Sequence, residues 1–206
     1  MDFTLEDISD DEMARRRAVF EPLVASVREL VDAVIRTEVG DEVIAEAQRT
    51  VAGVVDSLRA HQMDGAYGVR YTSRMVGMAW GNAAMGMRNA LAPPVYSERE
   101  GNAVRAEFTL GAAYEGPPGH VHGGVCALVL DQVLGEAAAA DTEASYTGTI
   151  EFRYRRPTPL GQLVARAEIV ERNGRKKTVR GTLSDAGGVT VEAQGLFIVP
   201  KSPPAL

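Results

Sequence analysis

One apolar stretch, residues 125–140, constrains the fold of this chain more than any other feature. It contains only three polar side chains, those of Asp131, Gln132 and Glu136. Its length, its alanines and its lack of proline predict a helix. Because this helix is apolar nearly all round, it must be buried on most of its sides. A curved sheet wrapped around it would bury it.

Strand-like segments stand on both sides of this helix. Before it, two segments flank a turn at Glu100-Gly101-Asn102, and the second alternates apolar and polar side chains. After it, four more are separated in part by turns at Asn173-Gly174 and at residues 186–188. The expected strands are 95–99, 104–110, 147–155, 162–172, 176–184 and 189–199. This order predicts an α+β fold in which a curved antiparallel sheet surrounds a central helix.

The first 60 residues have the spacing of two amphipathic helices. Ser9-x-x-Glu12 resembles a capping box at the start of the first. Pro22 suggests that its main part begins near Glu21, after a separate short helix. Asp41 is expected to cap the second helix. Because two such helices cannot bury both apolar stripes alone, they must pack on the rest of the chain or on a second chain.

We therefore expect a helical extension over residues 1–62, a main domain over 63–200 and a tail over 201–206. The extension could supply dimer contacts or act as a lid.

The formal net charge of -6 argues mildly against nucleic-acid or anionic-membrane partners. Cys126 is the only cysteine, which excludes an intrachain disulfide, and its apolar surroundings suggest a small buried side chain. The acidic N-terminus does not resemble a signal peptide, and no run of about 18 apolar residues is present. We expect a cytoplasmic protein.

The segment from Tyr114 to Gly124 is rich in glycine and proline and leads into the apolar helix. At its end, His122-Gly123-Gly124 stands where the helix should begin. A helix N-terminus presents unpaired N–H groups and a partial positive charge. A glycine there lets an oxygen atom approach the amide, as an oxyanion hole requires. A plain glycine-rich turn remains the alternative.

Asp131 lies in the middle of the apolar helix. A buried, unpaired carboxylate would cost several kcal/mol. The residue must therefore be paired, exposed on one helix face, or functional.

Together these residues resemble a known family. The segment 116–124, Gly-Pro-Pro-Gly-His-Val-His-Gly-Gly, followed by Asp131, is similar to the PaaI/THEM4-like branch of the hotdog-fold acyl-CoA thioesterases. Residues 154–161 resemble the segment that follows the next strand in that family. The resemblance covers roughly residues 89–199 and implies a hotdog fold with an N-terminal helical extension.

The resemblance also implies roles for individual residues. Asp131 would attack the thioester or activate a water molecule, and Gly123 would donate its N–H to the carbonyl. His122 would orient the loop or contact the carbonyl region. The substrate would also meet Gly124, Thr147 and His120. Several relatives carry Asn or Gln in the loop before the histidine, whereas Gly116 or a neighbour stands here, which leaves that auxiliary role unassigned.

Helix geometry adds a constraint on this site. Gly123 and Asp131 are eight residues apart, which corresponds to about 12 Å along a helix axis. One chain cannot place both against a single carbonyl group. We therefore expect a homodimer or a dimer of dimers, with active sites at the subunit interface. No metal and no cofactor are expected, apart from the CoA of the substrate.

Other readings are a hotdog dehydratase and an acyl-CoA-binding protein without turnover, although Asp131 argues against the latter. A cupin-like metal site at His120 and His122 would need a nearby glutamate, which is missing. The sequence contains no G-x-S-x-G motif, so nothing points to a serine hydrolase.

Two sets of residues could serve the substrate. Basic side chains near the later strands could meet CoA phosphates, and methionines could line an acyl pocket. The basic set is Arg153, Arg155, Arg156, Arg175, Lys176 and Lys177. The methionine set is Met75, Met78, Met85 and Met87.

Overall fold

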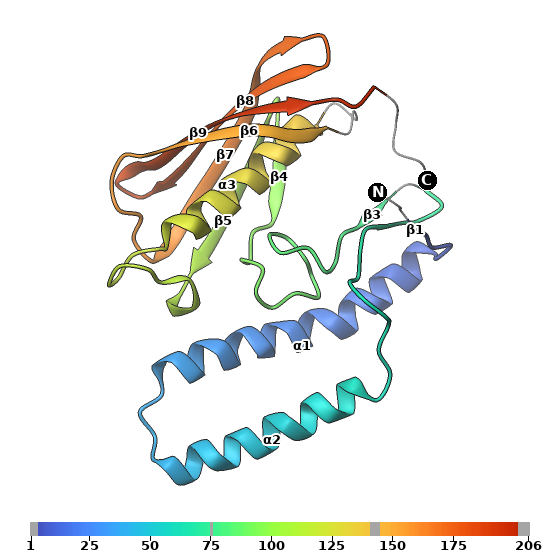
Figure 1. The fold of residues 1–206 in the computed structure, drawn as a ribbon, viewed down its shortest axis with the longest axis vertical. Helices are drawn as coiled ribbons and strands as arrows, with labels where there is room; N and C mark the ends of the chain where they lie inside the picture. The colour runs from blue at the N-terminus through green and yellow to red at the C-terminus, as the bar shows by residue number, and fades with distance from the viewer. Residues whose placement is uncertain (1–3, 75, 141–144, 202–206) are drawn as a thin grey trace.

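Six antiparallel strands and one helix form the main body of the molecule (Figure 1). The computed structural model describes residues 4–74, 76–140 and 145–201. The strands are β4 (Ser97–Glu100), β5 (Ala103–Leu110), β6 (Tyr146–Tyr154), β7 (Gly161–Asn173), β8 (Lys176–Asp185) and β9 (Gly188–Ile198). Their order in the sheet is β4-β5-β7-β8-β9-β6. The strand that follows the helix in sequence, β6, therefore lies at one edge, where it pairs only with β9.

The helix α3 (Gly123–Ala138) packs along one face of this sheet (Figure 1). Its buried side chains join those of the inward-facing strand residues in one core. They are Cys126, Val129, Leu130, Val133, Leu134, Ala137 and Ala138. Each buried Val or Leu contributes roughly 1.5–3 kcal/mol. The predicted helix wrapped by a sheet is confirmed, but one side of α3, which includes Gly124 and Asp131, remains exposed in the single chain.

A bulge near the start of β6 sets which side chains face α3. The register of β6 against β9 shifts between Thr147 and Thr149. Such an extra residue reverses the in-and-out alternation beyond it. A Cβ on Gly148 would lie 3.1 Å from the carbonyl oxygen of Leu196, so a larger residue fits poorly there. Thr147 consequently points to the same face of the sheet as Ile150, which packs against the core.

Two long helices, α1 (Asp10–Arg36) and α2 (Asp41–Arg59), precede the sheet. As predicted, the Ser9 hydroxyl caps α1 by accepting a hydrogen bond from Glu12 N, at 3.1 Å. The expected break before Pro22 is wrong, because α1 is continuous. An Arg17–Glu21 ion pair spans this turn, and the buried Val24 anchors the next, so the loss of one N–H donor does not end the helix. In α2 the N-cap is Gly40, without a side-chain bond, and Asp41 is instead the first helical residue.

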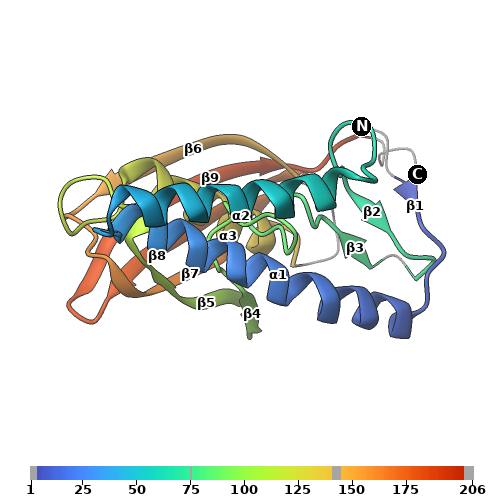
Figure 2. The same ribbon diagram turned by 90° about the horizontal axis from the view of Figure 1, so that it is seen from below.

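The helices lie below the sheet domain, with α2 farther from it than α1 (Figures 1 and 2). α1 contacts η1 (Ala112–Tyr114), a short 3₁₀ helix after β5. The first strand, β1 (Thr4–Leu5), joins β2 (Arg70–Tyr71) and β3 (Gly77–Met78) in a small second sheet. Over the described residues, no helix is long and apolar enough to span a membrane.

Half of the predicted methionine cluster fills a second, smaller core. Met78 and Met87 are buried beside Trp80, and Phe20 of α1 packs against them. Met85 is 42% exposed. Met75 lies outside the described residues. Core filling therefore accounts for two of the four methionines.

Candidate active site

The loop that leads into α3 is held at its end by His122. The backbone N–H of His122 donates to the carbonyl oxygen of Tyr114, at 2.9 Å, and its own carbonyl accepts from Val125 N. Its side chain is the N-cap of α3, because Nδ1 accepts a hydrogen bond from Gly124 N at 3.0 Å. This bond requires an unprotonated Nδ1. These three hydrogen bonds join His122 to the loop and to the start of α3; its role in the reaction stays a prediction.

The peptide group between Gly123 and Gly124 is fixed at both ends. Gly124 N donates to His122, and the Gly123 carbonyl accepts from the Tyr154 hydroxyl at 2.8 Å. The ring of Tyr154 also lies beside Gly123, where a Cβ would come within 3.5 Å of it. Among the described residues, no acceptor binds Gly123 N. An immobilised helix start with a free N–H is the geometry that an oxyanion hole needs.

Two positions in the loop require glycine, each for a different structural reason. A Cβ on Gly116 would lie 2.7 Å from the Cα of His122, so the position has no room for a side chain unless the loop shifts. The Asn or Gln expected from relatives cannot be accommodated at Gly116 in this conformation. Gly119 has a φ of 72°, and its N–H donates to the Glu115 carboxylate at 2.6 Å.

His120 is engaged within its own loop. Its Nδ1 lies 2.8 Å from the carbonyl oxygen of Pro118, and its backbone bridges to Pro159. The side chain is only partly exposed. Its expected substrate contact stays a prediction.

Asp131 and Thr147 form the second predicted group. The Thr147 hydroxyl donates to Asp131 Oδ1 at 3.3 Å, and both side chains are exposed. The cost of burying a carboxylate is thus avoided, because Asp131 lies on the open side of α3. Eight residues of helix separate it from Gly123, or about 12 Å. The structure brings the predicted residues together in two groups, not one.

A buried polar chain lies beneath the start of α3. The Cys126 thiol is 3.6 Å from the Thr158 hydroxyl, which donates to Thr190 Oγ1 at 2.9 Å. Cys126 is 1% exposed, as predicted, and burial raises the pKa of its thiol. A thiol kept protonated and out of contact with solvent is a poor nucleophile, which argues against Cys126 as a reactive group.

Most of the proposed phosphate-binding cations have partners within the chain. Arg153, Arg155 and Arg156 form ion pairs with Glu151, Glu192 and Asp185, respectively. Lys177 is fully buried, and its ammonium donates to the Ala138 carbonyl at the end of α3, at 2.8 Å. Lys177 lies on the same face of β8 as the buried Val179 and Leu183, so the alternation of the strand indicated its burial, but the basic run 175–177 obscured that signal.

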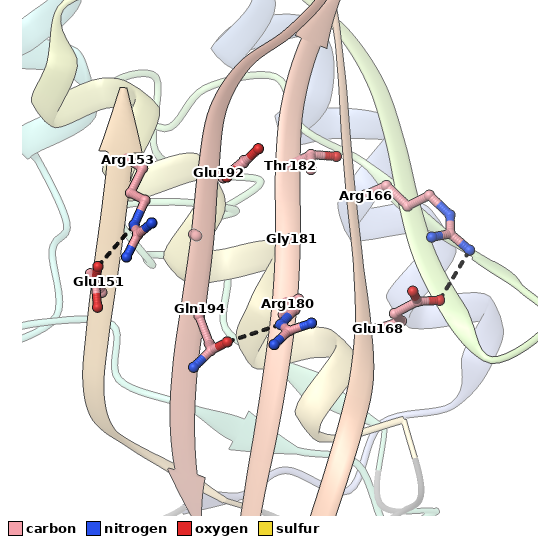
Figure 3. Close-up of a pocket in the computed structure, with 10 residues that line it drawn as sticks. Glu151, Arg153, Arg166, Glu168, Arg180, Gly181, Thr182, Glu192 and Gln194 are labelled. Carbon is pink, nitrogen blue, oxygen red and sulfur yellow. Dashed lines mark hydrogen bonds and ion pairs between the residues drawn. The ribbon is translucent and has the colours of Figure 1, made fainter. Parts of the chain in front are cut away.

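A hollow of about 470 Å³ lies on the face of the sheet that points away from α3 (Figure 3). Opposite charges alternate across it, and two pairs, Arg153–Glu151 and Arg166–Glu168, are closed by hydrogen bonds or ion pairs. The whole sheet separates this hollow from the helix that carries Asp131. It therefore does not contribute to the candidate site.

Two residues near the site were not predicted, Tyr154 and Glu115. Tyr154 stands at the end of a strand 31 residues from Gly123, and no local pattern reveals such a contact. Glu115 precedes the loop glycines, and its spacing of four from Gly119 is a weak signal at best. Among the described residues, no group of three His, Cys, Asp or Glu side chains could hold a metal ion.

Comparison with known proteins places these residues in a family. The sequence profile of the thioesterase superfamily matches residues 118–192, which contain both groups of the site. The chain is 33% identical over 94 residues to the acyl-coenzyme A thioesterase THEM4 of Mus musculus, and 34% identical over 94 residues to that of Xenopus laevis. These matches cover 44% of this chain but only 40% and 42% of the relatives, so the chain matches less than half of their length.

A solved structure matches over a larger part of the chain. The crystal structure of protein RHA08564, a thioesterase superfamily protein, is similar with a TM-score of 0.76 and 35% sequence identity. The match covers 87% of this chain and 90% of that one. The hotdog fold implied by the sequence is confirmed. The chain belongs to the thioesterase superfamily.

Proposed function

We propose that this protein hydrolyses the thioester bond of an acyl-CoA to a free acid and CoA. The observation that carries the proposal is a pair of groups on α3 that are open to a ligand. Gly123 presents an N–H that binds no acceptor in the described chain, and Asp131 presents an exposed carboxylate oriented by Thr147. The resemblance to relatives named acyl-coenzyme A thioesterases supports the choice of substrate.

In the proposed reaction, the Gly123 N–H donates to the thioester carbonyl oxygen and stabilises the negative charge that develops there. The Asp131 carboxylate either attacks the carbonyl carbon or removes a proton from an attacking water molecule. The carbon–sulfur bond then breaks, and the thiolate of CoA leaves and is protonated. One water molecule is consumed on either route, because an acyl-aspartyl intermediate is itself hydrolysed.

Both groups can act on one carbonyl only if they come from two subunits, because helix α3 holds them roughly 12 Å apart in one chain. The edge strand β6 suggests how the subunits meet. Within the described part of the chain only one side of β6 is paired, so its other side offers N–H and C=O groups to another strand.

An antiparallel pairing of β6 with β6 of a second copy would bring the two halves of the site together. Thr147 lies near the start of β6 and binds Asp131, whereas Tyr154 lies at its end and binds Gly123. A two-fold axis through the middle of the strand places the start of one β6 beside the end of the other. Asp131 of one subunit would then approach Gly123 of its partner. We therefore infer a dimer with two interfacial sites.

The direct test is release of free CoA thiol from a series of acyl-CoA esters. Asp131→Asn should abolish hydrolysis and leave folding intact, because an exposed side chain is exchanged for one of equal size. Gly123→Pro should also inactivate, since it deletes the N–H. The helix tolerates this change: Gly123 is its first residue, and His122 has the extended backbone, with ψ of 132°, that precedes proline readily.

Gly123→Ala is the matched control, because it keeps the N–H and its Cβ fits at ordinary contact distance from Tyr154. It should retain most of the activity that Gly123→Pro loses. Wild-type protein that binds acyl-CoA but hydrolyses none of the series would instead indicate a binding protein without turnover. Equal rates for wild type and Asp131→Asn would remove the carboxylate from the mechanism.

A further inference from the structure

Helix α2 presents an apolar stripe that nothing in the described chain covers. None of its 19 residues is buried. The stripe consists of Val43, Ile44, Ala47, Val51, Val54, Val55 and Leu58. Of these, Val43 is 56% exposed and Leu58 52% exposed. At 100° per residue the seven side chains fall within an arc of about 120°, as on a helix that packs on a partner.

The stripe borders a groove between the two helices. The groove has a volume of about 560 Å³ and is lined by Leu30 of α1 and by α2 residues that include Val43, Ala47 and Val51. Farther along α1, Val34 is 66% exposed. We call the stripe and this groove together the hairpin face. In Figures 1 and 2 it belongs to the part of the molecule farthest from the sheet.

The hairpin face has the spacing of a helix-packing interface. Positions 44, 47, 51, 54 and 58 follow the alternating three- and four-residue steps of a coiled-coil seam. A standard interface takes about 20–30 residues from each partner. The stripe and the groove lining together comprise 11 residues, so the hairpin face is a small contact. Exposed apolar patches of this extent are rare on monomers.

We propose that the hairpin face binds the hairpin face of a second copy of this chain, with the two α2 helices antiparallel. Charge favours this direction. The first turn of α2 holds Asp41 and Glu42, and the last turn holds Arg59 together with Asp56. Antiparallel pairing sets the doubly acidic start of each helix beside Arg59 of the other and also opposes their dipoles, whereas parallel pairing sets the two acidic starts together. The arrangement is a four-helix contact of two α1 and two α2 helices.

Site-directed cross-linking tests this contact without relying on the reaction. The natural Cys126 is buried, so wild type serves as the unreactive background. Val51→Cys or Val54→Cys, near the middle of α2, should each give a covalent dimer with a short bismaleimide at low protein concentration. Ala45→Cys, on the opposite side of the helix, should give little. Failure of both central variants to exceed the Ala45→Cys level would overturn the proposal.

Cysteines at the helix ends test the direction. In an antiparallel pair, Ile44→Cys alone and Leu58→Cys alone should not cross-link, but a mixture of the two should. Self-linking of both single variants would show a parallel pair and refute the arrangement. Adding Val54→Glu to Val51→Cys should abolish the cross-link, and adding Ala45→Glu should not. Equal cross-linking in both double variants would mean that the apolar stripe is not the contact. Circular-dichroism melting confirms that each variant is folded.

Discussion

His122 uses one of its two ring nitrogens to bind its own backbone. Because Nδ1 caps α3 through Gly124 N, the residue can support the site without touching the substrate. Asparagine is among the best N-cap residues, and alanine among the worst. We predict that His122→Ala lowers stability by about 1 kcal/mol and impairs hydrolysis, whereas His122→Asn restores most of both. Thermal unfolding and acyl-CoA assays of the two variants decide this. If His122→Asn is stable but as inactive as His122→Ala, the imidazole itself contacts the substrate.

Tyr154 acts on the other end of the same peptide group. Its hydroxyl donates to the Gly123 carbonyl at 2.8 Å, so it fixes the direction of the helix start that carries the free N–H. Tyr154→Phe keeps the ring beside Gly123 and removes only this bond. A net hydrogen bond is worth about 1 kcal/mol, so we expect kcat to fall roughly fivefold with KM little changed.

Tyr146→Phe is the control for Tyr154→Phe, because Tyr146 is the other tyrosine of β6 and is likewise exposed. Its hydroxyl has no bond to the helix start, so kcat should stay at the wild-type value. A change in KM alone for Tyr154→Phe would show that the hydroxyl contacts substrate and does not position the amide.

At the scale of elements, α3 has a second carboxyl group in an unusual environment. Glu136 accepts hydrogen bonds from Ser97 of β4 and from Gln132, the latter at 2.7 Å. Burial nevertheless raises the pKa of this carboxyl above its ordinary value. A raised pKa means that the fold disfavours the charged form. The contribution of Glu136 to stability is therefore fully present below the unfolded pKa of about 4.3 and is lost as the pH rises through the folded pKa.

We predict from this sign that Glu136→Gln raises the melting temperature at pH 7 to 8. The advantage over wild type should shrink as the pH falls to 4, because the wild-type carboxyl is then protonated in both states. Thermal melts across this range test it. Glu98→Gln, at an exposed position of β4, provides the control and should show no such trend. A melting temperature lowered at pH 7 would show that the two hydrogen bonds outweigh the cost of burial.

Most elements could be predicted from the sequence because their signals are local. The apolar run located α3 within two residues, and alternation with turn glycines located β5, β7, β8 and β9 equally well. Pro22 misled the prediction for α1, since packing of Phe20 and Val24 outweighs one lost hydrogen bond. The segment 67–80 had no clear pattern and contains two strands of two residues each. Their pairing with each other, and that of β2 with the distant β1, defines such short strands.

The sequence could predict which residues belong to the candidate site, but not the contacts that hold them in place. The glycine-rich loop and Asp131 stand out locally, and helix rise alone separates them into two groups. What joins each group to the rest depends on tertiary structure. The bulge at Gly148 turns Thr147 toward α3, and the end of β6 brings Tyr154 to Gly123. Neither the bulge nor that contact leaves a periodic signal in the sequence. The roles of these residues remain predictions, as do the domain boundaries.

At the scale of the whole molecule, the proposed pairing of β6 and the proposed contact of the hairpin face both make one chain an incomplete unit; over the described residues neither surface has a partner within the chain. The shared active site gives the most demanding test of this view. In a homodimer of the Asp131→Asn variant, both active sites lack the carboxylate. In a homodimer of the Gly123→Pro variant, both active sites lack the N–H. A mixed dimer is different, because the site that combines Asp131 from the second variant with Gly123 from the first is intact, while the other site is doubly altered.

We therefore predict that two inactive variants restore each other. Asp131→Asn and Gly123→Pro chains carrying different tags can be co-expressed, and the mixed dimer isolated through both tags. With one of its two sites intact, it should hydrolyse acyl-CoA at about half the wild-type rate per dimer. Mixed-tag dimers of Asp131→Asn alone should remain inactive and thus exclude contamination. A mixed dimer as inactive as its parents would place Asp131 and Gly123 of the same chain in one site. The 12 Å separation along α3 makes that arrangement untenable without rearrangement of the helix.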